Sequence, residues 1–146
     1  MRALLIFVAT LAIGVKFNLP KKTLLLSSTI AATAFFLVHT LIDWGATEAE
    51  AAFAGSFFVA LSAEYLAKTL KVPAPVISIP GIIPLVPGSV AYSAVISFLK
   101  KEETLGLETG TKALFIAVAI ASGLLLAGAL NRKFLRPDPR RTIQGE

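Results

Sequence analysis

The stretch Ile79-Pro80-Gly81-Ile82-Ile83-Pro84-Leu85-Val86-Pro87-Gly88 decides how this chain folds. It lies within an apolar segment, Val76–Leu99, that is long enough to cross a bilayer, yet it contains three prolines and two glycines. An interior proline removes a backbone donor and collides with the carbonyl group four residues earlier, so a continuous helix is disfavoured. In a membrane, such a break is tolerated only where protein surrounds it or a watery cavity solvates it. The stretch therefore predicts a discontinuous membrane helix, a device with which many transporters build substrate sites.

The composition is that of a membrane protein. Of the 146 residues, 55% are hydrophobic and 16% are charged, whereas soluble domains have about 25% charged residues. Cysteine is absent, which excludes disulfides and thiolate sites. The net charge of +5 is spread between apolar spans and forms no single stripe, so we expect the lipid bilayer as a partner and no nucleic acid.

The apolar segments predict an all-α fold, a polytopic bundle of five transmembrane helices of which the fourth is broken by proline and glycine. The predicted spans are Ala3–Phe17, Thr23–Ile42, Ala49–Leu66, Val76–Leu99 and Thr111–Leu130. The first span resembles a signal peptide, but it ends without a small-residue cleavage site and another apolar segment follows, so we interpret it as retained. Residues 1–136 form the membrane domain, and residues 137–146 form a short basic cytoplasmic tail.

The distribution of charge between the spans predicts the topology. Basic residues gather at alternate connections and after the last span: Lys16, Lys21, Lys22, Lys68, Lys71, Arg132, Lys133, Arg136, Arg140 and Arg141. Acidic residues gather at the other connections: Asp43, Glu48, Glu50, Glu102, Glu103 and Glu108. Because Lys and Arg are retained on the cytoplasmic side, we expect a cell (inner) membrane protein with its N-terminus outside and its C-terminus inside. A re-entrant fourth segment would put the arginine-rich tail outside, so the segment is expected to cross.

Small residues at four-residue spacing predict close helix packing in the last span. Two such patterns are present, Ala117-x3-Ala121 and Gly123-x3-Ala127. They fit a close-packed bundle or a contact with another subunit equally well.

Glu64 is the first candidate for a functional side chain, because a carboxylate in or near a membrane core is costly. It would bind a substrate ammonium group or carry a proton. The alternative is an i,i+4 ion pair with Lys68 at the interface.

His39 and Asp43 are also four residues apart and precede Trp44. They form either a proton relay or, as we favour, part of the headgroup region with Trp44 as an interfacial anchor. His39 is the only histidine and no serine lies in a nucleophile-elbow sequence, so a catalytic triad and a metal site are disfavoured. We therefore expect no enzyme and no cofactor.

The residues after the last proline suggest a binding site. A half-helix starting near Ser89 would direct its free amide groups and its positive dipole end at the break, where they would suit a carboxylate. Gly88 precedes it, and Tyr92 and Ser93 lie one turn further on, where their hydroxyl groups would add contacts. The alternative is a kinked span whose serines bond back to their own helix.

The motifs in this chain resemble those of the threonine/serine exporter family, in particular its small, five-span subunit. The resemblance rests on residues 62–68 (SAEYLAK), 70–75 (LKVPAP), 79–88 with Tyr92, 17–22 (FNLPKK) and 106–110 (GLETG). It covers nearly the whole chain, but residues 39–50 match no family pattern, so His39 and Asp43 inherit no role.

The resemblance implies secondary export of threonine, serine or a related small carboxylate such as succinate, together with a separately encoded large subunit. A homo-oligomer is a further option. We expect the proton gradient to drive export, with Glu64 as carrier or as partner of the substrate ammonium group. The expected substrate-binding or coupling residues are Glu64, Pro80, Gly81, Pro84, Pro87, Gly88, Ser89, Tyr92 and Ser93. The competing hypothesis is a structural subunit that only stabilises or assembles its partner.

Overall fold

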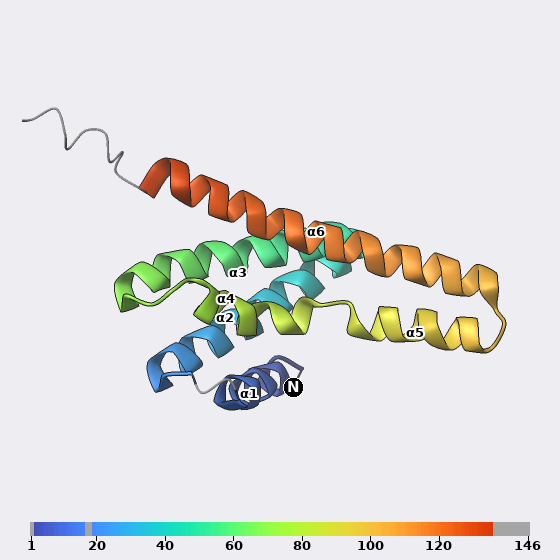
Figure 1. Cartoon of the computed structure of the whole chain (residues 1–146), viewed down its shortest axis with the longest axis horizontal. Coiled ribbons are helices and arrows are strands. Elements are labelled where there is room, and N and C mark those ends of the chain that lie inside the picture. The colour runs from blue at the N-terminus through green and yellow to red at the C-terminus, as the bar shows by residue number, and fades with distance from the viewer. Residues whose placement is uncertain (1, 17–18, 136–146) are drawn as a thin grey trace, which may run out of the picture.

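The computed structural model describes residues 2–16 and 19–135. This part of the chain forms six α-helices and one 3-10 helix and has no β-strand, so the all-α prediction is confirmed (Figure 1). The elements are α1 (Arg2–Lys16), α2 (Lys21–Asp43), α3 (Glu48–Leu70), α4 (Pro75–Ile82), η1 (Ile83–Leu85), α5 (Gly88–Leu99) and α6 (Glu103–Leu135). The predicted tail, residues 137–146, lies outside the described residues, as do residues 17 and 18.

The first two helices form an antiparallel pair that packs against α4. Hydroxyl groups are concentrated on the buried faces of this pair, at Thr10, Thr23, Ser27 and Ser28. Ser27 and Ser28 both donate to the carbonyl oxygen of Leu24, which satisfies these hydroxyl groups within α2. Small polar residues of this kind let membrane helices approach closely.

α3 begins with a capping box, in which the Thr47 hydroxyl group accepts from the Glu50 amide and the Glu50 carboxylate accepts from the Thr47 amide. Its buried face consists mainly of alanine, glycine and serine, and α6 packs against it. The two helices approach each other closely at Gly123, where an added Cβ would lie 2.7 Å from the carbonyl oxygen of Phe53. The two helices run in the same direction (Figure 1), as the predicted topology requires of the third and fifth spans. Gly123 and Ala127 are buried, whereas Ala117 and Ala121 face outward.

The predicted break is confirmed. α4 gives way to the 3-10 turn η1, and α5 starts at Gly88 with its axis bent by 48°. Val86 is extended (φ −63°, ψ 133°), as expected for a residue that precedes a proline. Pro80, in contrast, lies inside α4 and is buried, so only the Pro84–Pro87 part of the motif coincides with the break.

Two helices of the described part, α2 and Glu103–Arg132 of α6, are long and apolar enough to cross a membrane, and the bent α4–α5 pair is a third if it forms one span. α1 is short, with an apolar stretch from Leu5 to Lys16. α3 carries four charged residues. The five-span count therefore stays a prediction.

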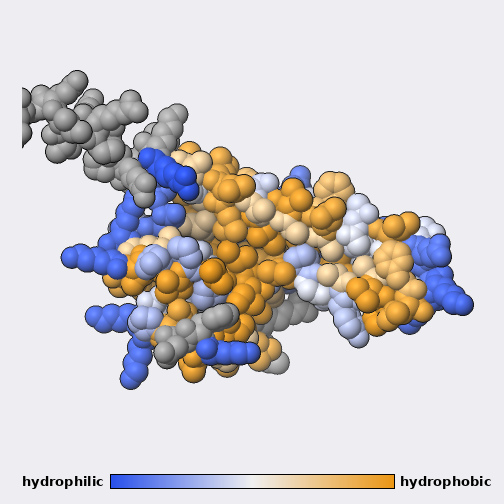
Figure 2. Space-filling model, viewed as in Figure 1, coloured by the Kyte–Doolittle hydropathy of each residue, from blue (hydrophilic) through white to orange (hydrophobic). Residues whose placement is uncertain are grey.

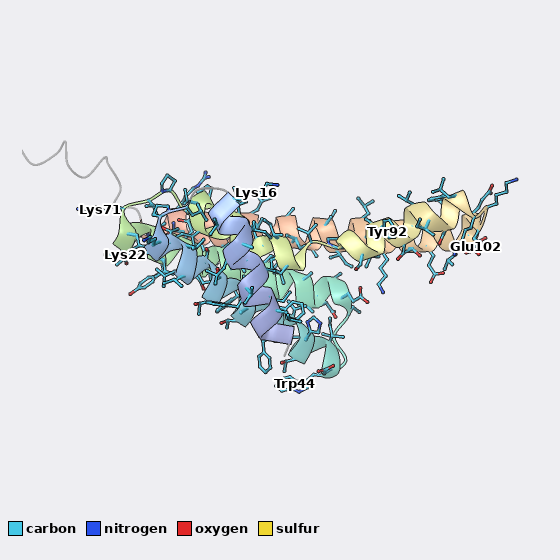
Figure 3. All side chains as sticks on the ribbon, turned by 90° about the horizontal axis from the view of Figure 1, so that it is seen from below. Lys16, Lys22, Trp44, Lys71, Tyr92 and Glu102 are labelled. Atoms are coloured by element: carbon cyan, nitrogen blue, oxygen red, sulfur yellow. The ribbon has the colours of Figure 1, made fainter. Side chains whose placement is uncertain are left out.

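The surface of the molecule matches a membrane environment. Hydrophobic side chains cover the middle of the molecule, and hydrophilic ones gather at its two ends (Figure 2). Lys16, Lys22 and Lys71 lie together at one end, and Tyr92 and Glu102 lie on the arm formed by α5 and the start of α6 at the other (Figure 3).

Candidate functional site

The start of α5 exposes backbone donors at the break. Pro87 occupies the N-cap position without a side-chain cap, and the Gly88 amide donates to the Val86 carbonyl at 2.7 Å. Ser89 and Val90 follow in the first turn, where amide groups have no carbonyl partner within their own helix. The sequence prediction of a half-helix that begins near Ser89 is therefore confirmed.

A cavity of about 440 Å³ adjoins this helix start. The broken segment lines one side of it with Pro84, Leu85, Pro87, Ser89 and Val90. α2, α3 and α6 supply the rest: Phe35, Val38, His39, Ile42, Glu48, Ala52 and Ile116. The break is thus bordered by protein and by a cavity that contains ionisable groups, the condition under which irregular backbone is tolerated at membrane depth.

A second cavity, of about 290 Å³, also adjoins the start of α5. It is lined by Ser89, Val90, Ser93, Leu105, Glu108, Thr109 and Lys112. Ser89 and Val90 belong to both linings, so the first turn of α5 borders both cavities.

An ion pair joins the linings of the two cavities. Lys112 Nζ lies 2.6 Å from Glu48 Oε1, and the two side chains are 51% and 41% exposed. Glu48 lines the first cavity and Lys112 the second. The charge-free stretch of α6, residues 113–130, begins directly after Lys112. The break therefore lies towards one end of this apolar stretch.

His39 also faces the first cavity. Its Nδ1 lies 3.1 Å from the Phe35 carbonyl oxygen, and its ring contacts the Phe35 ring with a centroid distance of 4.0 Å. Because a carbonyl oxygen only accepts, a hydrogen bond in this contact requires a proton on Nδ1. The predicted alternatives for His39, a relay with Asp43 or a headgroup residue, did not include a place beside the break.

Glu64 belongs to a separate polar cluster. The Asn131 side-chain amide donates to Glu64 Oε2, and Lys68 Nζ donates to Asn131 Oδ1 at 2.6 Å. Asn131 thus lies between the two residues for which the sequence suggested an i,i+4 pair. Glu64 also lines a cavity of about 170 Å³ with Ser78 and the start of α4.

This cluster is distant from the break. Glu48 and Glu64 are sixteen residues apart on one helix, which corresponds to about 24 Å along its axis. The carboxylate and ammonium groups of an α-amino acid are bonded to the same carbon atom. A substrate whose carboxylate lies at Ser89 therefore cannot reach Glu64 with its ammonium group in this conformation.

The remaining predicted residues have different environments. Tyr92 is 67% exposed and lines neither cavity of the break. Ser93 donates to the Ser89 carbonyl at 2.9 Å, which is the back-bonding alternative, while it also lines the second cavity. Gly81 is buried where α4 crosses α3, since an added Cβ would lie 2.8 Å from Val59 Cγ1. Pro80 and Gly81 thus serve packing in this structure, whereas Pro84, Pro87 and Ser89 reach the cavity.

Sequence reasoning missed Glu48, Lys112, Glu108 and Asn131 as site residues. The one available signal is the i,i+4 spacing of Glu108 and Lys112 just before a charge-free span.

The chemistry of the site is that of binding and passage. In the described residues, no group of three His, Asp or Glu side chains is arranged to hold a metal ion. The site instead combines a broken membrane helix, free amide donors and an ion pair between two cavities. These features define a membrane transporter.

The family model for "Threonine/Serine exporter, ThrE" matches residues 2–130. The chain belongs to this family, whose members are transporters rather than enzymes. Comparison with curated proteins and with solved structures gave no match.

Proposed function

We propose that this chain is the small subunit of a secondary exporter for threonine, serine or a related small carboxylate, and that it acts with a separate large subunit. The observation that carries the proposal is the cavity of about 440 Å³ beside the broken helix. The α5 amide groups and dipole end favour an anionic group there, and every substrate of the proposed class has a carboxylate.

The position of the cavity supports export in one direction. It lies near the acidic connection between α2 and α3, which the charge distribution assigns to the outside. The basic end, with Lys16, Lys22 and Lys71, would then face the cytoplasm (Figure 3). A substrate that leaves the break on the acidic side is released outside the cell.

An efflux assay tests the proposal. Cells that contain this chain, its large partner, or both are loaded with labelled threonine or succinate, and release is followed. We expect release only when both chains are present. Full release by the partner alone, stabilised by other means, would instead support a structural subunit.

A double substitution tests the role of the break. Pro84→Ala with Pro87→Ala restores two amide groups and favours a straight helix, so efflux should fall to a small fraction. Pro73→Ala is the matched control, because Pro73 lies in the exposed α3–α4 connection and lines none of the cavities described above. Equal efflux from the double variant and the control would show that the break is incidental.

A further inference from the structure

The Glu48–Lys112 ion pair joins the linings of the two cavities at the start of α5. Glu48 lines one cavity, Lys112 lines the other, and Ser89 borders both. The pair joins residues 64 positions apart in the chain and connects α3 to α6. A molecule that occupies these cavities beside Ser89 therefore has both charged side chains within the surrounding lining.

The pair is well suited to reversible opening. Both side chains are about half exposed, and ion pairs of this kind contribute little to stability because solvent screens them. Glu48 lies in the first turn of α3, so its free carboxylate remains favoured by the helix dipole after Lys112 leaves. Lys112 has three donors on a flexible stem and can bind another carboxylate without moving its helix.

We propose that Glu48 and Lys112 are the specificity-determining residues of the site, and that they exchange their mutual ion pair for the two charges of a zwitterionic substrate. The substrate carboxylate binds Lys112 and the α5 amide groups, and its ammonium group binds Glu48. This inference deepens the proposed function, on which it rests, and it assigns to Glu48 the ammonium contact that distance denies to Glu64.

The exchange discriminates between substrate classes. A zwitterion pairs with both protein charges. Its two new contacts therefore offset the loss of the Glu48–Lys112 ion pair. A dicarboxylate such as succinate pairs only with Lys112, and its second carboxylate is repelled by Glu48 and by Glu108, which lines the second cavity. The site therefore favours an amino acid over a dicarboxylate.

Substrate preference measured in the assembled exporter tests this assignment. The kcat/KM values for labelled threonine and labelled succinate are compared in wild type, Glu48→Gln and Lys112→Gln. In Glu48→Gln, threonine loses a hydrogen bond to a charged group, whereas succinate loses a repulsion. The threonine-to-succinate ratio of kcat/KM should therefore shift towards succinate by about tenfold or more. Lys112→Gln should lower kcat/KM for both substrates by a similar factor.

The pair could instead serve only to hold α3 against α6, and the same variants distinguish the two roles. A purely structural pair is broken equally by either substitution, so both variants would lower both activities together and leave the ratio within about twofold of wild type. That outcome would overturn the proposal. Glu50→Gln is the matched control, since Glu50 lies in the same turn of α3, bonds to Thr47 and lines neither cavity.

A second measurement does not depend on the identity of the substrate. Because this chain has no cysteine, Ser89→Cys gives it one thiol, at a position that lines both cavities. Its rates of modification by an anionic and a cationic thiol reagent of equal size report the local charge. Glu48→Gln should favour the anionic reagent and Lys112→Gln the cationic one, each by several-fold. A ratio of the two modification rates that stays constant in both variants would exclude Glu48 and Lys112 from the site. In the efflux assay, absence of threonine and succinate release in wild type would refute the proposed function, and it would leave this thiol measurement unaffected.

Discussion

Gly123 lies at a close contact between α3 and α6, and its replacement by alanine should separate these two helices. The added Cβ would lie 2.3 Å from Ser56 Oγ, 2.7 Å from the Phe53 carbonyl oxygen and 3.0 Å from the Phe57 amide nitrogen. A serine hydroxyl group can rotate, but backbone atoms move only with their helix. The contact with Phe53 is about 0.7 Å shorter than the 3.4 Å at which ordinary van der Waals contact begins, so α3 has to retreat by a similar distance.

The expected free-energy change follows from two opposing terms. Overpacking of a close contact costs about 1–3 kcal/mol. Alanine in place of glycine favours the helix by up to about 1 kcal/mol. Gly128→Ala in the same helix has only the second term, because an added Cβ there meets no atom within 4 Å. The difference between the two variants therefore isolates the clash, and we expect Gly123→Ala to be less stable than Gly128→Ala by about 1–3 kcal/mol.

Unfolding of the purified protein by SDS titration in mixed micelles, followed by circular dichroism, measures this difference. Gly123→Ala should unfold at a lower SDS fraction than wild type, and Gly128→Ala at an equal or higher one. Equal midpoints for the two variants would refute the close α3–α6 contact. The parallel packing from which the site is built would then be in doubt as well.

Three further predictions concern other parts of the molecule. Glu64→Gln retains an acceptor for Asn131 but cannot carry a proton, so it should abolish or uncouple export while the protein stays in the membrane. Unchanged proton-driven efflux would show that Glu64 is not the proton carrier. Single cysteines at Lys71 and Lys101 should react with impermeant thiol reagents from the cytoplasmic and outer side respectively, and labelling of both from one side would contradict the predicted orientation. Thr10 is fully buried, and its hydroxyl oxygen has no hydrogen-bond partner among the described residues. The isosteric Thr10→Val should therefore stabilise the protein by about 1 kcal/mol in the same SDS titration. A loss of stability would instead indicate that the hydroxyl group has a hydrogen-bond partner.

The features that could be predicted from the sequence are those that depend on local chemistry. Apolar stretches of sufficient length predict membrane helices wherever they occur, and the all-helical fold followed from them. Pro84 and Pro87 remove amide donors whatever surrounds them, so the break and the start of α5 were also predictable. The same pattern did not distinguish Pro80, which remains inside α4.

The tertiary structure decided which side chains meet. Glu48 pairs with Lys112 across 64 positions, and Asn131 bonds to Glu64 across 67. Both contacts depend on the register of α3 against α6, which is set where Gly123 lies against the α3 backbone. The sequence contains two small-residue patterns in the last span, and nothing local indicates that Gly123-x3-Ala127 packs while Ala117-x3-Ala121 faces outward. A helix offers several faces of similar composition. Which face is buried depends on the free energy of the whole packed bundle, to which all the helices contribute.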